Sequence, residues 1–262
     1  MNGVRAKKHL GQHFLKEDAI ARRIAESLTG HGGYRHVIEV GPGTGALTRH
    51  LVQRPDTRLV CYEVDGESVR YLREHFPGLE VRESDFLRMD PDSVTDGPMA
   101  VIGNFPYNIS TQIVFKVLAH RDRFPEMVGM FQKEVADRIC TGPGSRTYGI
   151  TSVLAQAWYD MEPLFTVERD AFVPPPEVRS AVMRMKRNAV AALPCDEALF
   201  TRVVRTAFNQ RRKTLSNALK PLGPEAVALI PADVRGARAE QLGVQDFITL
   251  TQAVQDGTAP AS

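Results

Sequence analysis

The sequence predicts an α/β fold with a small helical region at its carboxyl end, and three patterns support this. Short apolar runs alternate with helical patterns through the first two-thirds of the 262 residues. Strand patterns then follow one another after Thr151 with no full-length helix between them. Beyond residue 190 only helical patterns remain. We therefore predict a mainly parallel sheet covered by helices on both faces, with an antiparallel edge.

The expected strands are short runs of β-branched and other apolar residues, which is typical of buried strands. The first run stops at a glycine cluster, and the fourth leads into Asn104. The predicted strands cover residues 37–40, 59–64, 79–81, 99–102, 127–131, 152–157, 161–167 and 180–185.

The expected helices fall into two groups. Four alternate with the strands, at 46–53, 68–76, 111–119 and 133–139, and four follow them, at 196–208, 212–222, 225–230 and 244–254. A run of small residues over 188–194 indicates a linker. The predicted division is a sheet domain over 1–190, a helical domain over 191–255 and a disordered tail over 256–262.

Composition excludes several classes of protein. The chain is 43% hydrophobic and 24% charged, as expected for a soluble globular protein. No apolar run approaches the length of a membrane span, and the basic first eight residues lack the apolar core of a secretory signal. The three cysteines are far apart, which fits a reducing compartment and no metal cluster. We expect a cytoplasmic monomer without a metal ion.

The net charge of +2 is small, but its distribution is uneven. Residues 202–220 hold six basic side chains and no acidic one, which favours binding to phosphates. A solvated helix face is the alternative reading. The basic residues are Arg202, Arg205, Arg211, Arg212, Lys213 and Lys220.

A glycine-rich turn, Glu39-Val40-Gly41-Pro42-Gly43-Thr44-Gly45, ends the first strand and opens a helix. Glycines there let the backbone approach a ligand, and the helix start offers free N–H groups. The spacing is G-x-G-x-G, which differs from the G-x-G-x-x-G of dinucleotide-binding proteins. Taken alone, the segment could equally be a tight structural turn.

Two acidic residues support a ligand site. Glu63 ends the second strand, where a carboxylate can accept hydrogen bonds from both hydroxyls of a ribose. Asp85 follows the third strand and suits an adenine amino group, with Phe86 beside the ring. The glycine turn contains no Lys or Arg for a pyrophosphate. These features favour a nucleoside cofactor without pyrophosphate, a description that fits S-adenosylmethionine.

The tetrapeptide Asn104-Phe105-Pro106-Tyr107 follows the fourth strand. Asn104 and the carbonyl of Phe105 can accept both hydrogens of an exocyclic amine, which turns its lone pair toward a sulfonium methyl group. Pro106 fixes the turn, and Tyr107 can stack on a base. An ordinary β-turn is the structural alternative. Beside the cofactor residues, the tetrapeptide indicates methyl transfer to the amino group of a nucleobase.

Five segments together resemble the small-subunit rRNA adenine N6-dimethyltransferases over nearly the whole chain. They are Gly11-Gln12-His13-Phe14-Leu15, Glu39–Gly45, Asn104-Phe105-Pro106-Tyr107-Asn108-Ile109-Ser110, Phe172-Val173-Pro174-Pro175-Pro176 and Phe208-Asn209-Gln210-Arg211-Arg212-Lys213-Thr214-Leu215. The resemblance implies a Rossmann-like, seven-stranded class I methyltransferase sheet with a small all-helical C-terminal domain. It also implies dimethylation of two adjacent adenines near the 3′ end of 16S rRNA, within an immature small ribosomal subunit.

The resemblance also implies roles for individual residues. Cofactor contacts are carried over to His13, Leu15, Gly41, Glu63, Asp85 and Asn104. Phe172 would stack on a flipped adenine opposite Tyr107, and Arg205, Arg211, Arg212 and Lys213 would hold RNA. The family usually has Asn where His13 stands, and Leu where Phe105 stands, so pocket shape is expected to differ there. From the residues alone, Phe172 could be core and His13 an exposed turn residue.

Three other functions remain open at this stage. A large-subunit (23S) rRNA adenine methylase of the macrolide-resistance kind shares the cofactor domain and a similar tetrapeptide. A DNA amino-methyltransferase would use the same chemistry. A ribosome-assembly checkpoint or a nucleic-acid-binding module would need no catalysis, although the intact Gly41, Glu63, Asp85 and Asn104 argue against lost activity.

Overall fold

A computed structural model describes residues 4–7 and 10–258. Contacts divide the chain into two compact units. The first contains the residues up to Ala136 together with Asp160–Arg187, and the second contains Asp137–Tyr159 and the residues from Asn188 onward. The predicted cut after residue 190 therefore lies close to one observed boundary, but it misses the segment 137–159. Whether the two units act as a cofactor domain and an RNA-binding domain stays a prediction.

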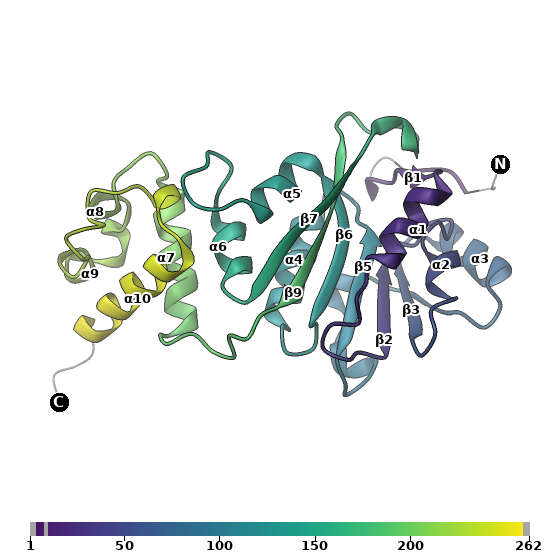
Figure 1. Ribbon diagram of the computed structural model, residues 1–262, viewed down its shortest axis with the longest axis horizontal. Helices are drawn as coiled ribbons and strands as arrows, with labels where there is room; N and C mark the ends of the chain where they lie inside the picture. Colours follow the sequence, from purple (N-terminus) through teal and green to yellow (C-terminus); the bar gives the residue numbers. More distant parts are fainter. Residues whose placement is uncertain (1–3, 8–9, 259–262) are drawn as a thin grey trace. The chain divides into compact units, whose positions relative to one another are not determined.

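The first unit is built on a mixed seven-stranded sheet, with helix α1 in front of it and α4 behind it in Figure 1. Strands β2 to β6 pair in parallel, and β9 joins β6 antiparallel, as predicted for the edge. The spatial order is β4 (Glu80–Glu83), β3 (Arg58–Glu63), β2 (His36–Val40), β5 (Met99–Asn104), β6 (Glu126–Gln132), β9 (Ser180–Arg187) and β7 (Tyr159–Val167).

Apolar residues cover both faces of the central strands, which explains their unbroken hydrophobic runs. The last four residues of β2 and the last five of β3 are buried. The helices that connect the strands begin at local signals, such as Asp65, whose side chain accepts a hydrogen bond from the Glu67 N–H at the start of α3. The helices of this unit are α1 (Asp18–Glu26), α2 (Thr48–Leu51), α3 (Gly66–His75) and α4 (Ser110–Ala119), with α5 (Lys133–Cys140) crossing into the second unit.

A separate two-stranded antiparallel sheet brings the N-terminal segment to a distant part of the chain. Strand β1 (Phe14–Leu15) pairs with β8 (Phe172–Val173), so that Leu15 lies opposite Phe172. Neither this pairing nor helix α1 was predicted. Short 3₁₀ helices follow several strands, namely η2 (Phe86–Arg88), η3 (Pro91–Ser93) and η4 (Arg169–Ala171).

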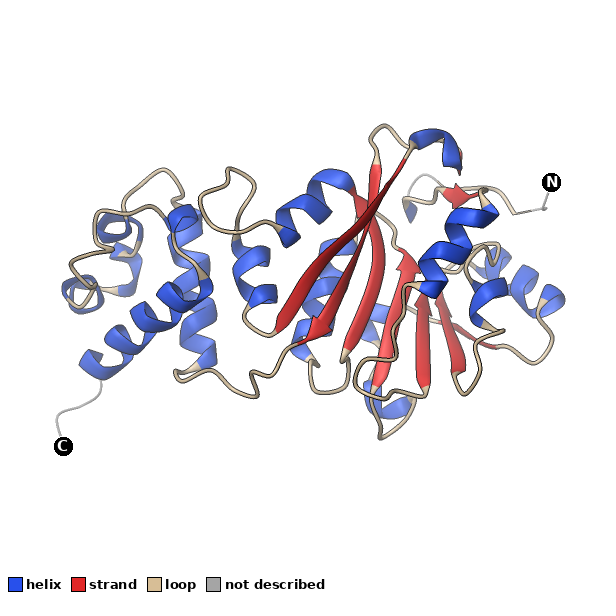
Figure 2. Cartoon of the chain, viewed as in Figure 1, coloured by secondary structure: helices blue, strands red, loops and turns tan. Residues whose placement is uncertain are grey.

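The second unit consists mainly of helices and loops, which Figure 2 shows in blue and tan. Helix α6 packs against α7 and α10. The Ser152 hydroxyl accepts a hydrogen bond from the Gly149 N–H at the start of α6. Its elements are α6 (Ile150–Gln156), α7 (Glu197–Asn209), α8 (Leu215–Ala218), η5 (Lys220–Leu222), α9 (Pro224–Ala228), η6 (Ala239–Gln241) and α10 (Val244–Thr258).

Three predictions of secondary structure are wrong. Residues 152–157 form most of α6 rather than a strand, because four consecutive residues from Ser152 are buried and no helical periodicity shows. The helix predicted over 212–222 is split into α8 and η5, where Pro221 stands at the start of the 3₁₀ turn. Residues 256–258 continue α10, whereas the rest of the predicted disordered tail lies outside the described residues.

Candidate active site

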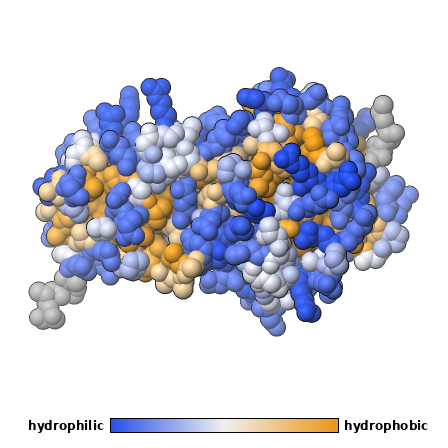
Figure 3. Space-filling view, in the orientation of Figure 1, coloured by the Kyte–Doolittle hydropathy of each residue, from blue (hydrophilic) through white to orange (hydrophobic). Residues whose placement is uncertain are grey.

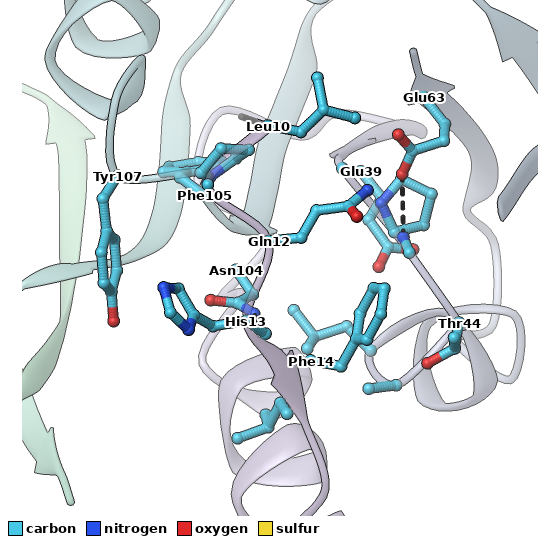
Figure 4. A pocket seen from close by; sticks show the side chains of 18 of the residues that line it. Leu10, Gln12, His13, Phe14, Glu39, Thr44, Glu63, Asn104, Phe105 and Tyr107 are labelled. Atoms are coloured by element: carbon cyan, nitrogen blue, oxygen red, sulfur yellow. Dashed lines mark hydrogen bonds between the residues drawn. The ribbon is translucent and has the colours of Figure 1, made fainter. Parts of the chain in front are cut away.

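A pocket opens at the carboxyl ends of β2, β3 and β5, where parallel sheets commonly bind ligands. The N-terminal segment closes one side of it, and the tetrapeptide after β5 closes another (Figure 4). Glu63 at the end of β3 and Asn104 at the end of β5 both line this pocket, and β2 lies between these two strands. The lining residues are Leu10, Gly11, Gln12, His13, Phe14, Leu15, Glu39, Gly41, Pro42, Gly43, Thr44, Ala46, Leu47, Glu63, Val64, Asn104, Phe105, Pro106 and Tyr107.

The glycine turn has the left-handed backbone that its sequence suggests. Gly41 and Gly43 have φ angles of 67° and 56°, and residues with a side chain rarely adopt such angles. At Gly43 a Cβ atom would also come within 2.8 Å of the Phe14 ring. Glycine at position 43 therefore allows β1 to lie directly against the turn, so that the N-terminal segment forms a wall of the pocket.

Glu63 is 4% exposed, and backbone N–H groups hold its carboxylate. One oxygen accepts from the N–H groups of Val64 and Asp65 at 2.9 Å each, and the other accepts from the Gly43 N–H at 3.1 Å. Burial raises the pKa of Glu63, while these N–H groups act in the opposite direction. A carboxylate offers about four lone pairs, so it retains capacity for a ligand hydroxyl.

Glu39 is a pocket residue to which sequence reasoning gave no role. Its side chain is 2% exposed, and it accepts a hydrogen bond from the Thr48 hydroxyl at 2.7 Å. Burial raises the pKa of Glu39 to about 7. The signal in the sequence was an acidic residue inside an otherwise apolar strand, because such a group is rarely buried without a purpose.

The side-chain amide of Asn104 has a defined orientation. Its Nδ2 lies 2.8 Å from the backbone oxygen of His13. A carbonyl oxygen only accepts hydrogen bonds, so the NH₂ group must face it. The amide oxygen of Asn104 is therefore left to act as an acceptor at the pocket.

Phe105 departs from the usual leucine, and its ring lies in the core rather than obstructing the pocket. The ring is 1% exposed and packs edge-on against Phe131, with centroids 5.2 Å apart. A Cβ atom at Gly129 would lie 2.2 Å from this ring, and one at Gly103 would lie 2.7 Å from it. Two glycines on adjacent strands thus make room for the larger side chain.

Tyr107 is held from two directions. Its hydroxyl lies 2.6 Å from the Ser180 hydroxyl, and its ring stacks on His13 with centroids 5.5 Å apart. The Nδ1–H of His13 donates to the Pro174 carbonyl at 2.9 Å, which fixes the imidazole in turn. In Figure 4 the His13 ring lies beside both Tyr107 and the Asn104 amide. Burial raises the pKa of Tyr107, and the Ser180 hydrogen bond opposes that shift.

Two of the predicted site residues lie outside the pocket lining. Phe172 is 2% exposed and belongs to the hydrophobic core with Leu15, beside a shallow surface groove. Asp85 accepts a hydrogen bond from the Leu87 N–H at 2.9 Å and caps η2, while Phe86 is buried. Their roles in base stacking and adenine binding stay predictions.

The edge of the pocket also carries a polar cluster that the sequence did not reveal. Lys7 forms an ion pair with Asp65, and the Gln12 amide lies 3.5 Å from the same carboxylate. Burial alone would raise the pKa of Asp65, but the hydrogen bonds from Lys7 and Ser68 lower it, and the net effect is a lowered pKa. These contacts tie the N-terminal segment to the start of α3, next to Glu63.

The predicted RNA-binding residues lie in the second unit and are not equivalent. Arg205 is exposed on α7, and Arg212 and Lys213 are exposed in the turn after it. Arg211 instead donates to the Ser145 carbonyl at 3.2 Å and lies 3.6 Å from Glu240. Its guanidinium therefore supports the fold of this unit, which argues against a free phosphate-binding role.

Hydrophobic side chains also show at the surface beside the site. Figure 3 shows apolar residues as patches among hydrophilic ones. Val64 is 53% exposed at the pocket, and Val173 is 55% exposed at the groove beside Phe172. Among the described residues, no helix is long and apolar enough to span a membrane, and no cluster of three metal-ligating side chains is present.

Comparison with known proteins identifies relatives over nearly the full length. A family model described as ribosomal RNA adenine dimethylase matches residues 3–256. The chain is 51% identical to a Cytophaga hutchinsonii protein named ribosomal RNA small subunit methyltransferase A, over 96% of this chain and 98% of that protein. It is also 51% identical to a Bacteroides thetaiotaomicron protein of the same name, over 100% and 99% of the two chains.

Solved structures support the same fold. A dimethyladenosine transferase from Plasmodium falciparum superimposes with a TM-score of 0.75 at 24% identity, covering 91% of this chain and 96% of that one. The 23S rRNA methyltransferase ErmE gives a TM-score of 0.71 at 27% identity, covering 92% and 99%. The seven-stranded sheet and the helical carboxyl end are thus those of a class I methyltransferase.

Proposed function

The chain belongs to the ribosomal RNA adenine dimethylase family, and from this premise we propose that it dimethylates two adjacent adenines near the 3′ end of 16S rRNA. The methyl donor is S-adenosylmethionine, and the product is N6,N6-dimethyladenosine. The observation that carries the proposal is Asn104, whose amide NH₂ is bound by the His13 carbonyl and whose oxygen is left for an amine. Relatives at about half identity are named for the small subunit, whereas the 23S enzyme is only 27% identical.

The pocket suits this cofactor by the chemistry of its lining. S-adenosylmethionine supplies a methyl group on a positively charged sulfur, and the pocket presents two carboxyl groups, Glu39 and Glu63. Among the described lining residues there is no lysine or arginine, which favours a nucleoside without a pyrophosphate. Glu63 would bind the ribose hydroxyls, and the backbone at Gly41, His13 and Leu15 would complete the site. Asp85 would bind the adenine amino group.

Catalysis follows from orientation of the amine by this chain. The Asn104 oxygen and the Phe105 carbonyl each accept one N6 hydrogen, which draws the nitrogen out of conjugation and directs its lone pair toward the methyl group. Fixing two reactants in this way can contribute about 7–11 kcal/mol. The nitrogen would take the methyl group as the bond between that carbon and sulfur breaks, which leaves S-adenosylhomocysteine, and would lose one proton to water or a carbonyl. In the second transfer the monomethylated nitrogen has one hydrogen left, which only one of the two acceptors can bind.

The target base must leave its helix or loop to reach Asn104, because a stacked base is inaccessible. Tyr107 offers the stacking ring beside Asn104. Phe172 is the proposed partner on the opposite face of the base. Since that ring is 2% exposed, the residues that cover it must move when the base enters.

The exposed basic residues of the second unit are proposed to hold the RNA backbone. Arg205, Arg212 and Lys213 are exposed at the surface, whereas Arg211 is engaged by Ser145 and Glu240. Contacts of this kind add affinity without selecting a sequence. We further propose that the chain acts as a cytoplasmic monomer on an immature small subunit, and that it contributes to ribosome biogenesis.

Mass spectrometry of rRNA tests the function directly. Small subunits that lack the modification, large-subunit RNA and duplex DNA are each incubated with the protein and S-adenosylmethionine. We expect two dimethyladenosines near the 3′ end of 16S rRNA and no modification elsewhere. The Asn104→Ala variant is the negative control. Methylation confined to large-subunit RNA or to DNA would refute the proposal.

A further inference from the structure

Ser180 occupies a fixed position next to the active site without lining the pocket. It is the first residue of β9 and pairs with Gln132 on β6. Its side chain is 0% exposed, and β9 lies inside the sheet between β6 and β7. The neighbouring Lys133 N–H donates to the Arg179 carbonyl at 2.9 Å. The Ser180 hydroxyl is therefore carried by a buried strand that has a neighbouring strand on each side.

A buried hydroxyl requires a hydrogen-bonding partner, since burial without one costs free energy. The partner of Ser180 is the Tyr107 hydroxyl at 2.6 Å. The other end of Tyr107 is fixed by its backbone, whose carbonyl accepts from the Ser110 hydroxyl at 3.1 Å. The aromatic ring between these two points has little freedom to tilt.

We propose that Ser180 is a positioning residue that sets the plane of the Tyr107 ring for the incoming base. The proposal rests on the proposed function, because it assigns a means of orienting the base at that site. Stacking holds a base productively only if the ring plane is set, and small displacements at a reacting centre are costly. His13 covers one face of the ring, and Ser180 secures its far end.

The chain connectivity gives this bond a second consequence. Ser180 and the proposed stacking partner Phe172 lie on the same segment, which runs from β8 into β9. Pro174, in between, accepts the hydrogen bond from His13. One segment thus carries Phe172 itself and the anchors for both His13 and Tyr107. The spacing between the aromatic groups at the site is set by this segment.

Three variants test the proposal: Ser180→Ala, Tyr107→Phe and the double variant. The measurement is the single-turnover rate of methyl transfer to unmodified small subunits at saturating S-adenosylmethionine. Because both single variants remove the same hydrogen bond, each should slow the reaction roughly 3- to 10-fold. The double variant should be no slower than the slower single variant. Cofactor affinity, measured by calorimetry, should not change.

The matched control is Thr251→Val, which removes a different buried hydroxyl. Thr251 is 0% exposed in α10 and donates to the Phe247 carbonyl at 2.7 Å. This variant should keep the wild-type rate. An equal loss in Thr251→Val, a wild-type rate in Ser180→Ala, or effects that multiply in the double variant would overturn the proposal. Tyr107→Phe leaves β9 intact, so it remains informative if Ser180→Ala folds poorly.

A spectroscopic measurement needs no RNA. The Ser180 hydrogen bond lowers the pKa of Tyr107 against the effect of burial, so Ser180→Ala should raise that pKa. Absorbance titration, with Tyr107→Phe as the reference, isolates this phenol. An unchanged pKa would overturn the proposal even if the enzyme is active. If wild-type protein fails to methylate small subunits while the pKa moves as expected, the proposed function fails and the bond stands.

Discussion

Replacing Asn104 by alanine removes the acceptor that faces the amine and the donor that binds the His13 carbonyl at 2.8 Å. These two losses act on different quantities. The lost hydrogen bond should lower the free energy of unfolding by about 1 kcal/mol, which corresponds to a melting temperature lower by roughly 2–4 °C. The lost acceptor lowers the rate of methyl transfer. It should leave substrate binding nearly unchanged, because the Phe105 carbonyl still accepts one N6 hydrogen.

Removal of one preorganised hydrogen-bonding group at a reacting centre typically costs about 2.7–4 kcal/mol, which is a 10²–10³-fold fall in rate. We therefore expect Asn104→Ala to slow single-turnover methyl transfer by that factor. Binding of small subunits and of S-adenosylmethionine should stay within a few-fold of wild type, since Glu63 and the glycine turn are untouched. The rate is measured with labelled cofactor, and the affinities by filter binding and calorimetry.

Asn104→Asp separates the two roles of the side chain. The aspartate keeps an acceptor but places a second oxygen against the His13 carbonyl, where the present contact is 2.8 Å. Two acceptors at that distance repel, so the N-terminal segment should loosen and the rate should fall. A variant of either kind that methylates at the wild-type rate would refute the assigned role of Asn104.

Three further predictions concern binding, stability and RNA. Glu63→Ala should weaken S-adenosylmethionine binding at least tenfold in calorimetry, because three N–H groups lose their partner and the ligand hydroxyls lose theirs; unchanged affinity would contradict this. The pKa of Glu39 is raised to about 7, so the folded chain binds an extra proton between the unfolded value near 4.3 and that pKa, and the free energy of unfolding falls as pH rises through this range. The Glu39→Gln variant does not lose this stability, so its free energy of unfolding relative to wild type should rise by up to roughly 3 kcal/mol between pH 4.5 and pH 8. Denaturant unfolding of both proteins measures this difference, and the same difference at both pH values would count against the prediction. Replacing Arg205 and Arg212 by alanine should lower the salt dependence of small-subunit binding by about 1–2 in log–log slope without affecting cofactor affinity, and an unchanged slope would exclude these contacts.

The strands of the sheet could be predicted because each is a short apolar run with a clear end. The strand at 99–102 ends beside Asn104 as expected, and Asn104, Glu63 and the glycine turn do meet in one pocket. The parallel pairing and the antiparallel edge follow from general rules for α/β folds, which is why they could be stated in advance.

Other features were missed for identifiable reasons. Pairing of β1 with β8 joins residues more than 150 positions apart, and a two-residue strand carries no periodic signal. The helix at Ile150–Gln156 is buried on several sides, so its residues do not alternate as an exposed helix would. The burial of Phe172 and the ion pairing of Arg211 depend on neighbours that only the folded chain brings together.

The packing of Phe105 has a consequence for how such a sequence can change. A ring at this position fits only because Gly103 and Gly129 have no side chains, and an alanine at 129 would place its Cβ 2.2 Å from the ring. At position 103 a side chain is excluded whatever stands at 105, because its Cβ would also lie 2.6 Å from the Val40 carbonyl oxygen. At position 129 the closest clash is with the Phe105 ring itself, so glycine there is a condition for phenylalanine at 105. Leucine at 105 alone would leave an unfilled space between two strands, so positions 105 and 129 are expected to vary together over evolution.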